Sequence, residues 1–273
     1  MQLSNLAKLL LAACLIYTCS KAGTPQVNDN QNDSDGVINV MSYNIQHGRG
    51  MDDEINLERI ADVIKEEGAD IVALQEVDVG VERSNRLDIP RELSELTGMP
   101  YFTFGKNIEF EGGEYGNATL SKYPITMEDN VHYQQLGSEQ RGILQTVIDY
   151  NGRDILILNT HLDYSEDDEE RLLYVQGMRD SIITEHDTDA AIAAGDFNDF
   201  PGSATHEKMK EFMYDLWEEK GEGDGFTFPP DDPDRRIDYI FHDDGLRALE
   251  ARVPQTMASD HLPVVGVFQF IED

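Results

Sequence analysis

Five short segments of the chain each bring an acid–base or metal-binding residue to the end of an apolar run. They cover residues 41–45 (MSYNI), 74–77 (LQEV), 159–162 (NTHL), 195–199 (GDFND) and 259–263 (SDHLP). If the apolar runs are strands, their polar ends meet at one edge of a sheet. Carboxylate and amide oxygens suit a hard divalent cation, and histidine is the usual acid–base group near neutral pH. The order of the segments therefore predicts an oxygen-liganded cation beside a histidine.

The carboxylate of Glu76 follows the apolar run Ile71–Leu74 and should emerge where a buried strand surfaces. Mg²⁺ binds such a carboxylate and keeps several waters. Asn44 ends the preceding strand in the same way, and its amide oxygen could bind or orient a ligand. Taken singly, such an acid is more often a solvated residue at a strand end, and such an asparagine is more often a turn former.

The segment around Asp196 has a sharper pattern. Gly195 allows a tight exit from a buried strand, and the i, i+2 spacing of Asp196 and Asn198 aims both side chains to one side. A carboxylate there can hold or deprotonate an attacking water, and an amide N–H can stabilise charge that grows on a phosphate oxygen. An Asx-rich loop without function is the alternative interpretation.

Two histidines complete the candidate site. His161 ends the run Ile155–Leu158, and Asp260-His261 lies at the entrance to a strand. Asp238 is a charge within an apolar strand; if buried, it needs a partner, and His261 is the natural candidate. One such histidine alone is more often structural, but two beside several strand-end acids favour catalysis.

The elements that must position these residues are indicated by hydrophobic periodicity. Strands are expected at 37–45, 70–77, 101–105, 117–120, 143–150, 154–160, 190–195, 236–241 and 264–270, with a Gly-rich loop at 111–116. Helices are expected at 57–64, from Pro90 to near Gly98, and at 172–182. Asn151-Gly152 predicts a two-residue hairpin. This mixture of hairpins and helical crossovers favours two mixed sheets covered by helices over one parallel sheet.

The charge of the chain is strongly acidic, with 21 Lys and Arg against 54 Asp and Glu among 273 residues and a net charge of −33. Such a surface repels polyanions unless bound cations reverse the sign locally. A nucleic-acid substrate is therefore disfavoured, although not excluded. Solubility or adaptation to salt would explain the same composition.

The N-terminus has the pattern of an export signal. Residues 9–17 are almost wholly apolar, follow Lys8, and are too few for an ordinary transmembrane helix. A cysteine that ends such a run resembles the lipidation site of a bacterial lipoprotein. Cys19 gives the better apolar length and Cys14 the better motif; we prefer Cys19, and a plain secretory signal is the alternative. We expect an exported protein, lipid-anchored in the bacterial cell envelope or secreted.

The chain after the signal divides into a tether and one domain. Residues 1–18 are interpreted as the signal peptide, and 19–36 as a flexible tether too polar to bury a core. No comparable break follows, so 37–273 is interpreted as one catalytic domain, which we expect to be a monomer. Both cysteines precede this domain, so it can form no disulfide.

The ordered set of motifs resembles the endonuclease/exonuclease/phosphatase superfamily, which includes deoxyribonuclease I, apurinic endonucleases, neutral sphingomyelinases and inositol polyphosphate phosphatases. The resemblance covers essentially all of 37–273. It implies a four-layer α/β sandwich, with two mixed β-sheets packed face to face and flanked by helices. It also implies cleavage of a phosphoester with Mg²⁺, for which Mn²⁺ could substitute.

On the metal side, the resemblance implies that Glu76 is the principal Mg²⁺ ligand, with Asn44 beside it and Asp260 nearby. Asn117 resembles the additional phosphate-side asparagine of the family. Arg141, which precedes a strand, could contact substrate phosphate, since a guanidinium suits that group. Arg83, Arg86 and Lys106 are further cations near the motifs, and for any one of these residues, Arg141 included, ordinary surface charge is the better explanation.

On the water side, the resemblance implies that Asp196 positions and activates the attacking water and that Asn198 binds the phosphate. His161 would bind the phosphoryl oxygen or protonate the leaving group. His261, oriented by Asp238, would act as base or electrostatic partner. The roles of the two histidines could be exchanged.

Departures from the subfamily patterns narrow the substrate. Gln46 stands where apurinic endonucleases carry Asp, Ala-Ala precedes Gly195 where inositol phosphatases carry Trp, and the disulfides of deoxyribonuclease I cannot form. What remains resembles the secreted bacterial branch, including sphingomyelinase-like members. We therefore expect an Mg²⁺-dependent hydrolase of a phospholipid headgroup or small phosphoester. An extracellular nuclease is the enzymatic alternative, and a catalytically inactive surface binding protein the non-enzymatic one.

Overall fold

Two mixed β-sheets packed face to face form the centre of the molecule. The structure is a computed structural model that describes residues 36–137, 139–184 and 187–271. Both cysteines, the predicted signal peptide and nearly all of the predicted tether fall outside these residues. The part from Asp35 to Asp273 clusters as one unit. Among the described helices, none has the length and apolar character needed to cross a bilayer.

Each sheet has six strands within the described residues. The first has the order β11–β12–β1–β2–β4–β3, and the second β5–β6–β7–β8–β10–β9. Only the pairs β1–β2 and β7–β8 are parallel. The bounds are β1 Val37–Asn44, β2 Ile71–Val79, β3 Tyr101–Phe110, β4 Gly113–Ser121, β5 Ile125–Val131, β6 Ile143–Tyr150, β7 Arg153–His161, β8 Ala190–Asp196, β9 Tyr214–Asp215, β10 Asp238–His242, β11 Leu246–Arg252 and β12 Val264–Phe270.

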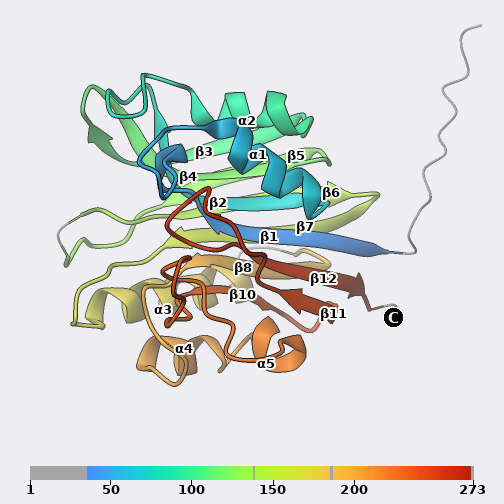
Figure 1. The fold of residues 1–273 in the computed structure, drawn as a ribbon. Coiled ribbons are helices and arrows are strands. Elements are labelled where there is room, and N and C mark those ends of the chain that lie inside the picture. Colours follow the sequence, from blue (N-terminus) through green and yellow to red (C-terminus); the bar gives the residue numbers. More distant parts are fainter. Residues whose placement is uncertain (1–35, 138, 185–186, 272–273) are drawn as a thin grey trace, which may run out of the picture. The chain divides into compact units, whose positions relative to one another are not determined.

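Helices cover the outer faces of the two sheets (Figure 1), with α1 and α2 on one side and α3 and α4 on the other. The bounds are η1 Gln46–Gly48, α1 Leu57–Glu66, α2 Ile89–Thr97, α3 Glu169–Thr184, α4 Ala204–Met209 and α5 Leu216–Lys220. Local sequence sets these ends. Asp88 caps α2 through the backbone N–H of Arg91, and Gly98 ends it in a left-handed conformation. The predicted four-layer α/β sandwich is confirmed.

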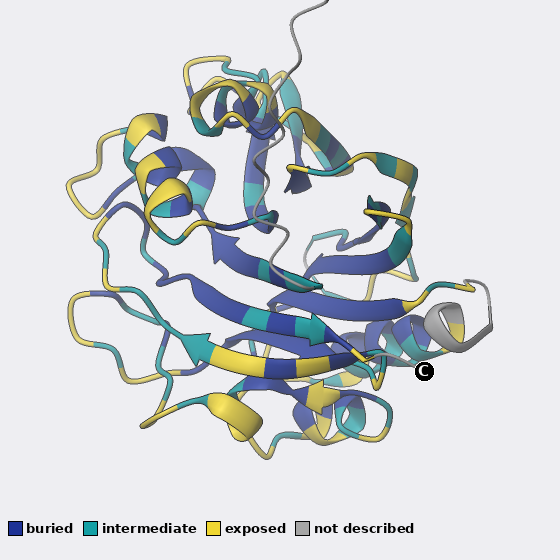
Figure 2. Cartoon of the chain, turned by 90° about the vertical axis from the view of Figure 1, so that its right-hand side faces the viewer, coloured by how far each residue is buried: buried dark blue, intermediate teal, exposed yellow. Residues whose placement is uncertain are grey.

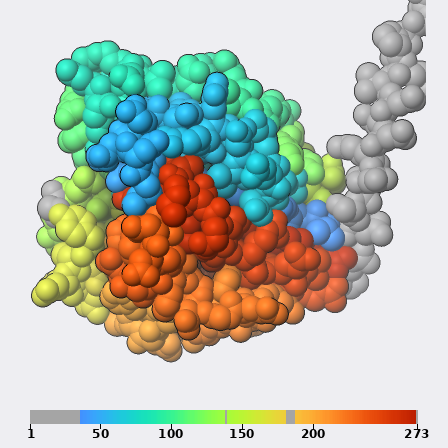
Figure 3. Space-filling view, viewed as in Figure 1, coloured from blue at the N-terminus to red at the C-terminus, as the bar shows by residue number. Residues whose placement is uncertain are grey.

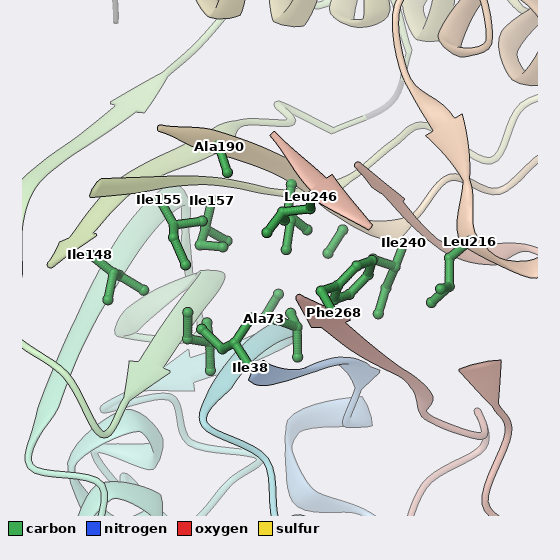
Figure 4. Packing of buried hydrophobic residues seen from close by; sticks show 14 of the residues in the cluster. Ile38, Ala73, Ile148, Ile155, Ile157, Ala190, Leu216, Ile240, Leu246 and Phe268 are labelled. Atoms are coloured by element: carbon green, nitrogen blue, oxygen red, sulfur yellow. The ribbon is translucent and has the colours of Figure 1, made fainter. Parts of the chain in front are cut away.

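Period-two alternation assigns each buried strand residue to a layer. In β1, Ile38 and Val40 face the other sheet, whereas Met41 and Tyr43 face the helices. The strand β7 alternates in the same manner. Figure 4 shows Ile38 and Ala73 of the first sheet opposite Ile155 and Ile157 of the second. Figure 2 shows the result: the central strands are buried, whereas exposed residues lie in loops, on outer helix faces and on edge strands such as β11.

Some expected elements differ from those in the structure. The predicted Gly-rich loop at 111–116 is mostly strand, because β3 and β4 form a hairpin whose turn is only Glu111-Gly112. The strand β2 continues past Glu76 to Val79. The strand expected from Arg236 begins at Asp238. The strands β5, β9 and β11 and the helices α4 and α5 were not predicted, since their sequences are short or mostly polar.

Candidate functional site

The ends of the two parallel strand pairs bring the candidate residues together. His161 ends β7 and lies opposite Asp196, the last residue of β8. On the other side of Asp196, the first residue of β10, Asp238, is its antiparallel partner. In the first sheet, Asn44 ends β1 opposite Gln75 of β2. Strand register alone therefore places a histidine and a second carboxylate beside Asp196.

Gly195 is required where β8 approaches β7. A Cβ atom at this position would lie 2.0 Å from the backbone oxygen of Thr160. Any side chain would push the two strands apart, and with them Asp196 and His161. The sequence feature interpreted as a tight strand exit thus reflects a close approach between the backbones of neighbouring strands.

Asn44 links the two sheets through its side-chain amide. Its Nδ2 donates to Glu76 Oε1 at 3.2 Å and to Asp196 Oδ2 at 3.1 Å. Its Oδ1 accepts the backbone N–H of Gln46 at 3.1 Å. Two carboxylates on one side and an N–H donor on the other fix the orientation of the amide. In this structure Asn44 acts as a donor that positions two acids, while its oxygen faces the backbone.

Glu76 occupies a strained position. Its φ is +57°, and the register of β2 with β4 shifts between Leu74 and Val77. A bulge of this kind re-aims a side chain without ending the strand, and a non-glycine residue with positive φ has a free-energy cost that the surrounding structure must offset. The bulge therefore directs the Glu76 side chain to the site at the strand ends, although Glu76 lies within β2.

Glu76 and Asp260 form an oxygen donor set, and neither acid makes a salt bridge to another described residue. Burial, and then the charge of Asp260, raise the pKa of Glu76. Burial also raises the pKa of Asp260, whose Oδ2 accepts from Nε2 of Gln46 at 2.7 Å. A divalent cation would favour the ionised form of both acids, and hard cations prefer such oxygens. The residues present therefore fit an oxygen-liganded divalent metal.

The two histidines approach Asp196 from different sides and differ in protonation. Nε2 of His161 lies 3.5 Å and Nε2 of His261 3.8 Å from Asp196 Oδ2. Burial, and then the charge of Arg141, lower the pKa of His161 well below its usual value. Burial alone would lower the pKa of His261, but the carboxylates of Asp238 and Asp196 raise it to about 10. At neutral pH His161 is neutral and His261 is a cation.

Asp238 orients His261, as its sequence context suggested. Its Oδ2 lies 2.9 Å from His261 Nδ1 and also accepts from the hydroxyl of Thr227 at 2.5 Å. Burial, and then the charge of Asp238, raise the pKa of Asp196 to about 7. Donor atoms of Asp196, Asp238 and His261 lie within 4.8 Å of one another. Because a protonated imidazole cannot bind a metal, this group is better suited to proton transfer than to holding an ion.

Comparison with known proteins identifies the family. The model of the endonuclease/exonuclease/phosphatase family matches residues 41–261. The chain belongs to this family. Its members are typically phosphoester hydrolases, and they generally use a divalent metal.

Relatives and solved structures agree with this assignment. The protein YbhP of Escherichia coli (strain K12) is 27% identical over 239 residues, which cover 82% of this chain and 93% of YbhP. A family protein from Bacteroides thetaiotaomicron has a TM-score of 0.72 at 18% identity, covering 86% of this chain and 98% of that one. A mannosyl-6-phosphatase from the same species scores 0.70 at 19% identity, covering 85% and 100%. Truncated TDP2 from Caenorhabditis elegans scores 0.65 at 20% identity, covering 85% and 97%.

Three further residues, which the sequence suggested as phosphate-binding, lie around Asp196 and His161. Asn198 has a φ of +50°; its backbone N–H donates to Asp196 Oδ1 at 2.9 Å and its Nδ2 to the oxygen of Leu162 at 3.1 Å. Asn117 is buried and makes only long hydrogen bonds to backbone oxygens, at 3.4 and 3.5 Å. Arg141 is 3% exposed and pairs with Glu139 at 2.9 Å, while its Nε has no partner among the described residues.

Sequence reasoning missed three residues of the site. Gln46 was noted only as a departure from a subfamily, yet it bonds Asp260. Thr227 and Phe228 were not singled out, although Thr227 bonds Asp238 and the ring of Phe228 lies 4.7 Å from that of His261. A Thr-Phe-Pro-Pro segment indicates a turn, but nothing in it reveals its partner. These contacts arise where distant segments meet; Figure 3 shows the C-terminal segment (red) against residues near 50 (blue) and residues 220–235 (orange).

Proposed function

We propose that this protein is a Mg²⁺-dependent hydrolase that cleaves a small phosphoester by attack of water. The observation that carries the proposal is the hydrogen-bonded chain from Glu76 through Asn44 to Asp196, with His161 and His261 beside Asp196. It links an oxygen-rich metal site to a proton-transfer centre, as metal-assisted hydrolysis requires.

Glu76 and Asp260 would hold the cation, with Mn²⁺ able to substitute for Mg²⁺. When bound, the cation would polarise the phosphoryl group and offset the charge that grows on it. Asn44 keeps Glu76 and Asp196 in fixed relation, and Gln46 holds one oxygen of Asp260. These amides set the direction of the carboxylates, which is the usual contribution of residues behind the ligands.

Asp196 would orient the attacking water and accept its proton. His261, kept cationic by Asp238, would face the negative charge of the phosphoryl group, whereas neutral His161 would contact the phosphoryl oxygen or the leaving group. Asn198 would bind the phosphate after its side chain leaves the oxygen of Leu162. Arg141 would contribute a buried positive charge near His161. Positioned groups of this kind are each worth about 10²-fold or more in rate.

The substrate would be a phospholipid headgroup or a small phosphoester. The net charge of −33 makes a polyanionic duplex an unfavourable partner. One structural neighbour is named a mannosyl-6-phosphatase, which supports including sugar phosphates among the compounds tested. We further propose that the protein is exported and anchored by a lipid on Cys19. A Cys19→Ser variant should leave the membrane fraction, whereas Cys14→Ser should remain in it.

A substrate panel tests the reaction class directly. The purified domain is given p-nitrophenyl phosphate, bis-p-nitrophenyl phosphate, sphingomyelin, sugar phosphates and supercoiled plasmid, each with Mg²⁺, with Mn²⁺ and with EDTA. We expect metal-dependent turnover of a small ester or headgroup and little nicking of plasmid. Preferential nicking would favour the nuclease. Metal binding by calorimetry with no turnover on any compound would favour a catalytically inactive binding protein.

The metal assignment has its own test. Glu76→Gln should raise the dissociation constant for Mn²⁺ at least 10- to 100-fold, because it removes one of two ionised ligands. Glu82→Gln is the matched control, since Glu82 is exposed and forms an ion pair with Arg86 at the surface. Calorimetry without substrate measures both constants. Equal affinity in Glu76→Gln and wild type would remove Glu76 from the metal site.

A further inference from the structure

Arg83 is an unusually well-fixed cation beside the candidate site. Its Nε and Nη2 each donate to a different oxygen of Asp78, both at 2.9 Å. Asp78 is fully buried, whereas the side chain of Arg83 is 31% exposed. Burying a carboxylate has a large free-energy cost unless it is paired. Asp78 therefore serves to hold one arginine at the surface in a single orientation, by a fork-shaped pair.

Two aromatic rings pack against the guanidinium of Arg83. The guanidinium carbon of Arg83 lies 4.6 Å from the ring centre of Phe110 and 5.2 Å from that of Tyr115. Both rings belong to the β3–β4 hairpin, in which only Tyr115 falls within the predicted Gly-rich loop at 111–116. Gly113 allows this hairpin to reach the segment after β2, because a Cβ there would lie 2.4 Å from the backbone carbon of Gly80. The glycine is needed to bring the rings to the arginine.

Arg83 and these two rings lie next to the metal side of the site. Tyr115 pairs in register with Asp78, two residues along β2 from Glu76. The positive charge of Arg83 acts on Glu76, where it opposes the rise in that residue's pKa. Buried His47, whose Nδ1 has no partner among the described residues, lies on the same side: burial, and then the charge of Arg83, lower its pKa to about 4. Arg83 and the phenol of Tyr115 thus lie close enough to Glu76 for their charges to interact, and the neutral imidazole of His47 lies near Arg83.

The pairing with Asp78 does not exhaust the donors of Arg83. Within the described part of the chain, its Nη1 makes no hydrogen bond. Burial, and then the charge of Glu76, raise the pKa of Tyr115 well above its usual value, so the phenol keeps its proton and remains a donor. The side chain of neighbouring Arg86, by contrast, is exposed and makes long contacts of 3.4 and 3.5 Å to described residues. A rigid guanidinium and a phenol form a suitable cradle for an oxyanion.

We propose that Arg83 and Tyr115 form a subsite for a second oxyanion on the substrate, separate from the phosphate that is cleaved. The preferred substrate is then a phosphoester that carries another phosphate, sulfate or carboxylate group. This inference rests on the proposed hydrolase and names its substrate class. It also accounts for Arg83 and the Gly-rich segment, which the reaction itself does not use.

A matched pair of substrates tests the subsite. Glucose 6-phosphate and glucose 1,6-bisphosphate, or the corresponding pair of diesters if the enzyme prefers diesters, are compared at saturating Mg²⁺. Wild type should have the higher kcat/KM for the member that carries two phosphate groups. Arg83→Gln should reduce that preference about 10-fold or more, the usual effect of losing a hydrogen bond between charged groups. Arg83→Lys should recover part of it, because it restores charge without the fork, and Arg86→Gln should behave as wild type.

The subsite can be tested without turnover. Inorganic sulfate is titrated into ¹⁵N-labelled protein, with and without Mg²⁺, while the arginine side-chain and the 80–86 and 110–116 backbone resonances are followed. We expect saturable shifts that require Arg83 and survive Arg86→Gln. Sulfate binding without turnover of any ester would retain the subsite and refute the hydrolase. Equal effects of Arg83→Gln on both substrates, or sulfate shifts unchanged by that variant, would overturn the subsite.

Discussion

Two buried histidine–aspartate pairs in this molecule look alike and differ in one respect. His261 lies 2.9 Å from Asp238, and His206 of α4 lies 2.8 Å from Asp215. In the second pair, both side chains have all the strong hydrogen-bond partners that a buried histidine and a buried carboxylate require. His206 Nδ1 accepts the backbone N–H of Gly202, and Asp215 also binds Arg236 and the N–H of Trp217.

The first pair is left open. Nε2 of His261 points toward Asp196, 3.8 Å away, and Oδ1 of Asp238 has no partner among the described residues. Asp215, which His206 binds, and Asp196, which His261 of the open pair faces, have opposite pKa shifts. Burial would raise the pKa of Asp215, but hydrogen bonds from His206 and the charge of Arg236 lower it, whereas burial and Asp238 raise that of Asp196 to about 7. Polar atoms left without a hydrogen-bond partner, more than the histidine–aspartate pairing itself, separate a catalytic centre from a structural one.

The largest contrast should come from Asp196, which the open pair faces, and Asp215, which belongs to the other pair. Asp196→Asn removes the proposed proton acceptor and should lower kcat about 10³-fold or more while leaving the fold intact. Asp215→Asn should retain kcat within a few-fold. It should lower the free energy of unfolding by about 3 kcal/mol, because it leaves Arg236 buried without its charge partner. Steady-state kinetics and urea denaturation measure the two effects. Comparable activity in both variants would abolish the distinction between the pairs.

The histidines should repeat the contrast at smaller size. His261→Gln should reduce kcat about 10²- to 10³-fold, since a positioned acid–base group is lost. His206→Gln should change kcat little and lower the free energy of unfolding by about 1–3 kcal/mol, the cost of unsatisfied buried partners. The circular dichroism spectrum of each variant checks that it folds. A strong loss of kcat in a folded His206→Gln would show that the second pair also acts in the reaction.

The pH dependence sharpens the comparison, because Asp238 raises two pKa values at once. Deprotonation of Asp196 should set the acid limb of kcat/KM, and deprotonation of His261 the alkaline limb. The negative charge of Asp238 favours the protonated form of both groups. Asp238→Asn should therefore move both limbs to lower pH, by about one pH unit or more. Limbs that stay in place would mean that other groups control the rate.

The layered fold could be predicted from the sequence because its causes are local. Alternation in Val37–Asn44 and the turn residues Asn151-Gly152 act over a few positions, and the hairpin and strands they predict are present. The bulge at Glu76 could not be predicted, because it depends on the register of β2 with β4. The same is true of the short β9 and the partly exposed β11, which owe their existence to neighbouring strands.

The candidate site shows the same division. The pairing of His261 with Asp238 could be expected, since a buried acid needs a partner and few are available. The bridging amide of Asn44 could not, because its neighbours Glu76 and Asp196 are set by the packing of two sheets. Protonation was equally inaccessible. The two histidines are similar in sequence context, and only burial and nearby charges distinguish them.

The smallest expected effect concerns Thr227, whose hydroxyl donates to Asp238 Oδ2 at 2.5 Å. Thr227→Val removes this donor while preserving shape, so Asp238 should hold His261 less firmly. The loss of one hydrogen bond to a carboxylate, about 1.5 kcal/mol, corresponds to roughly a 10-fold decrease in kcat. Thr227→Ser should keep most of the activity, because it retains the hydroxyl.

A matched control for Thr227 lies in the structural half of the comparison. Thr205 of α4 is also buried, but its hydroxyl has no hydrogen-bond partner among the described residues. Thr205→Val should leave kcat unchanged and should keep or slightly raise the free energy of unfolding, since no bond is lost and a polar atom is removed from the interior. If the two valine variants lower kcat equally, the hydroxyl of Thr227 has no specific part in orienting His261. If only Thr227→Val lowers kcat, the hydroxyl of Thr227 acts on His261 through Asp238.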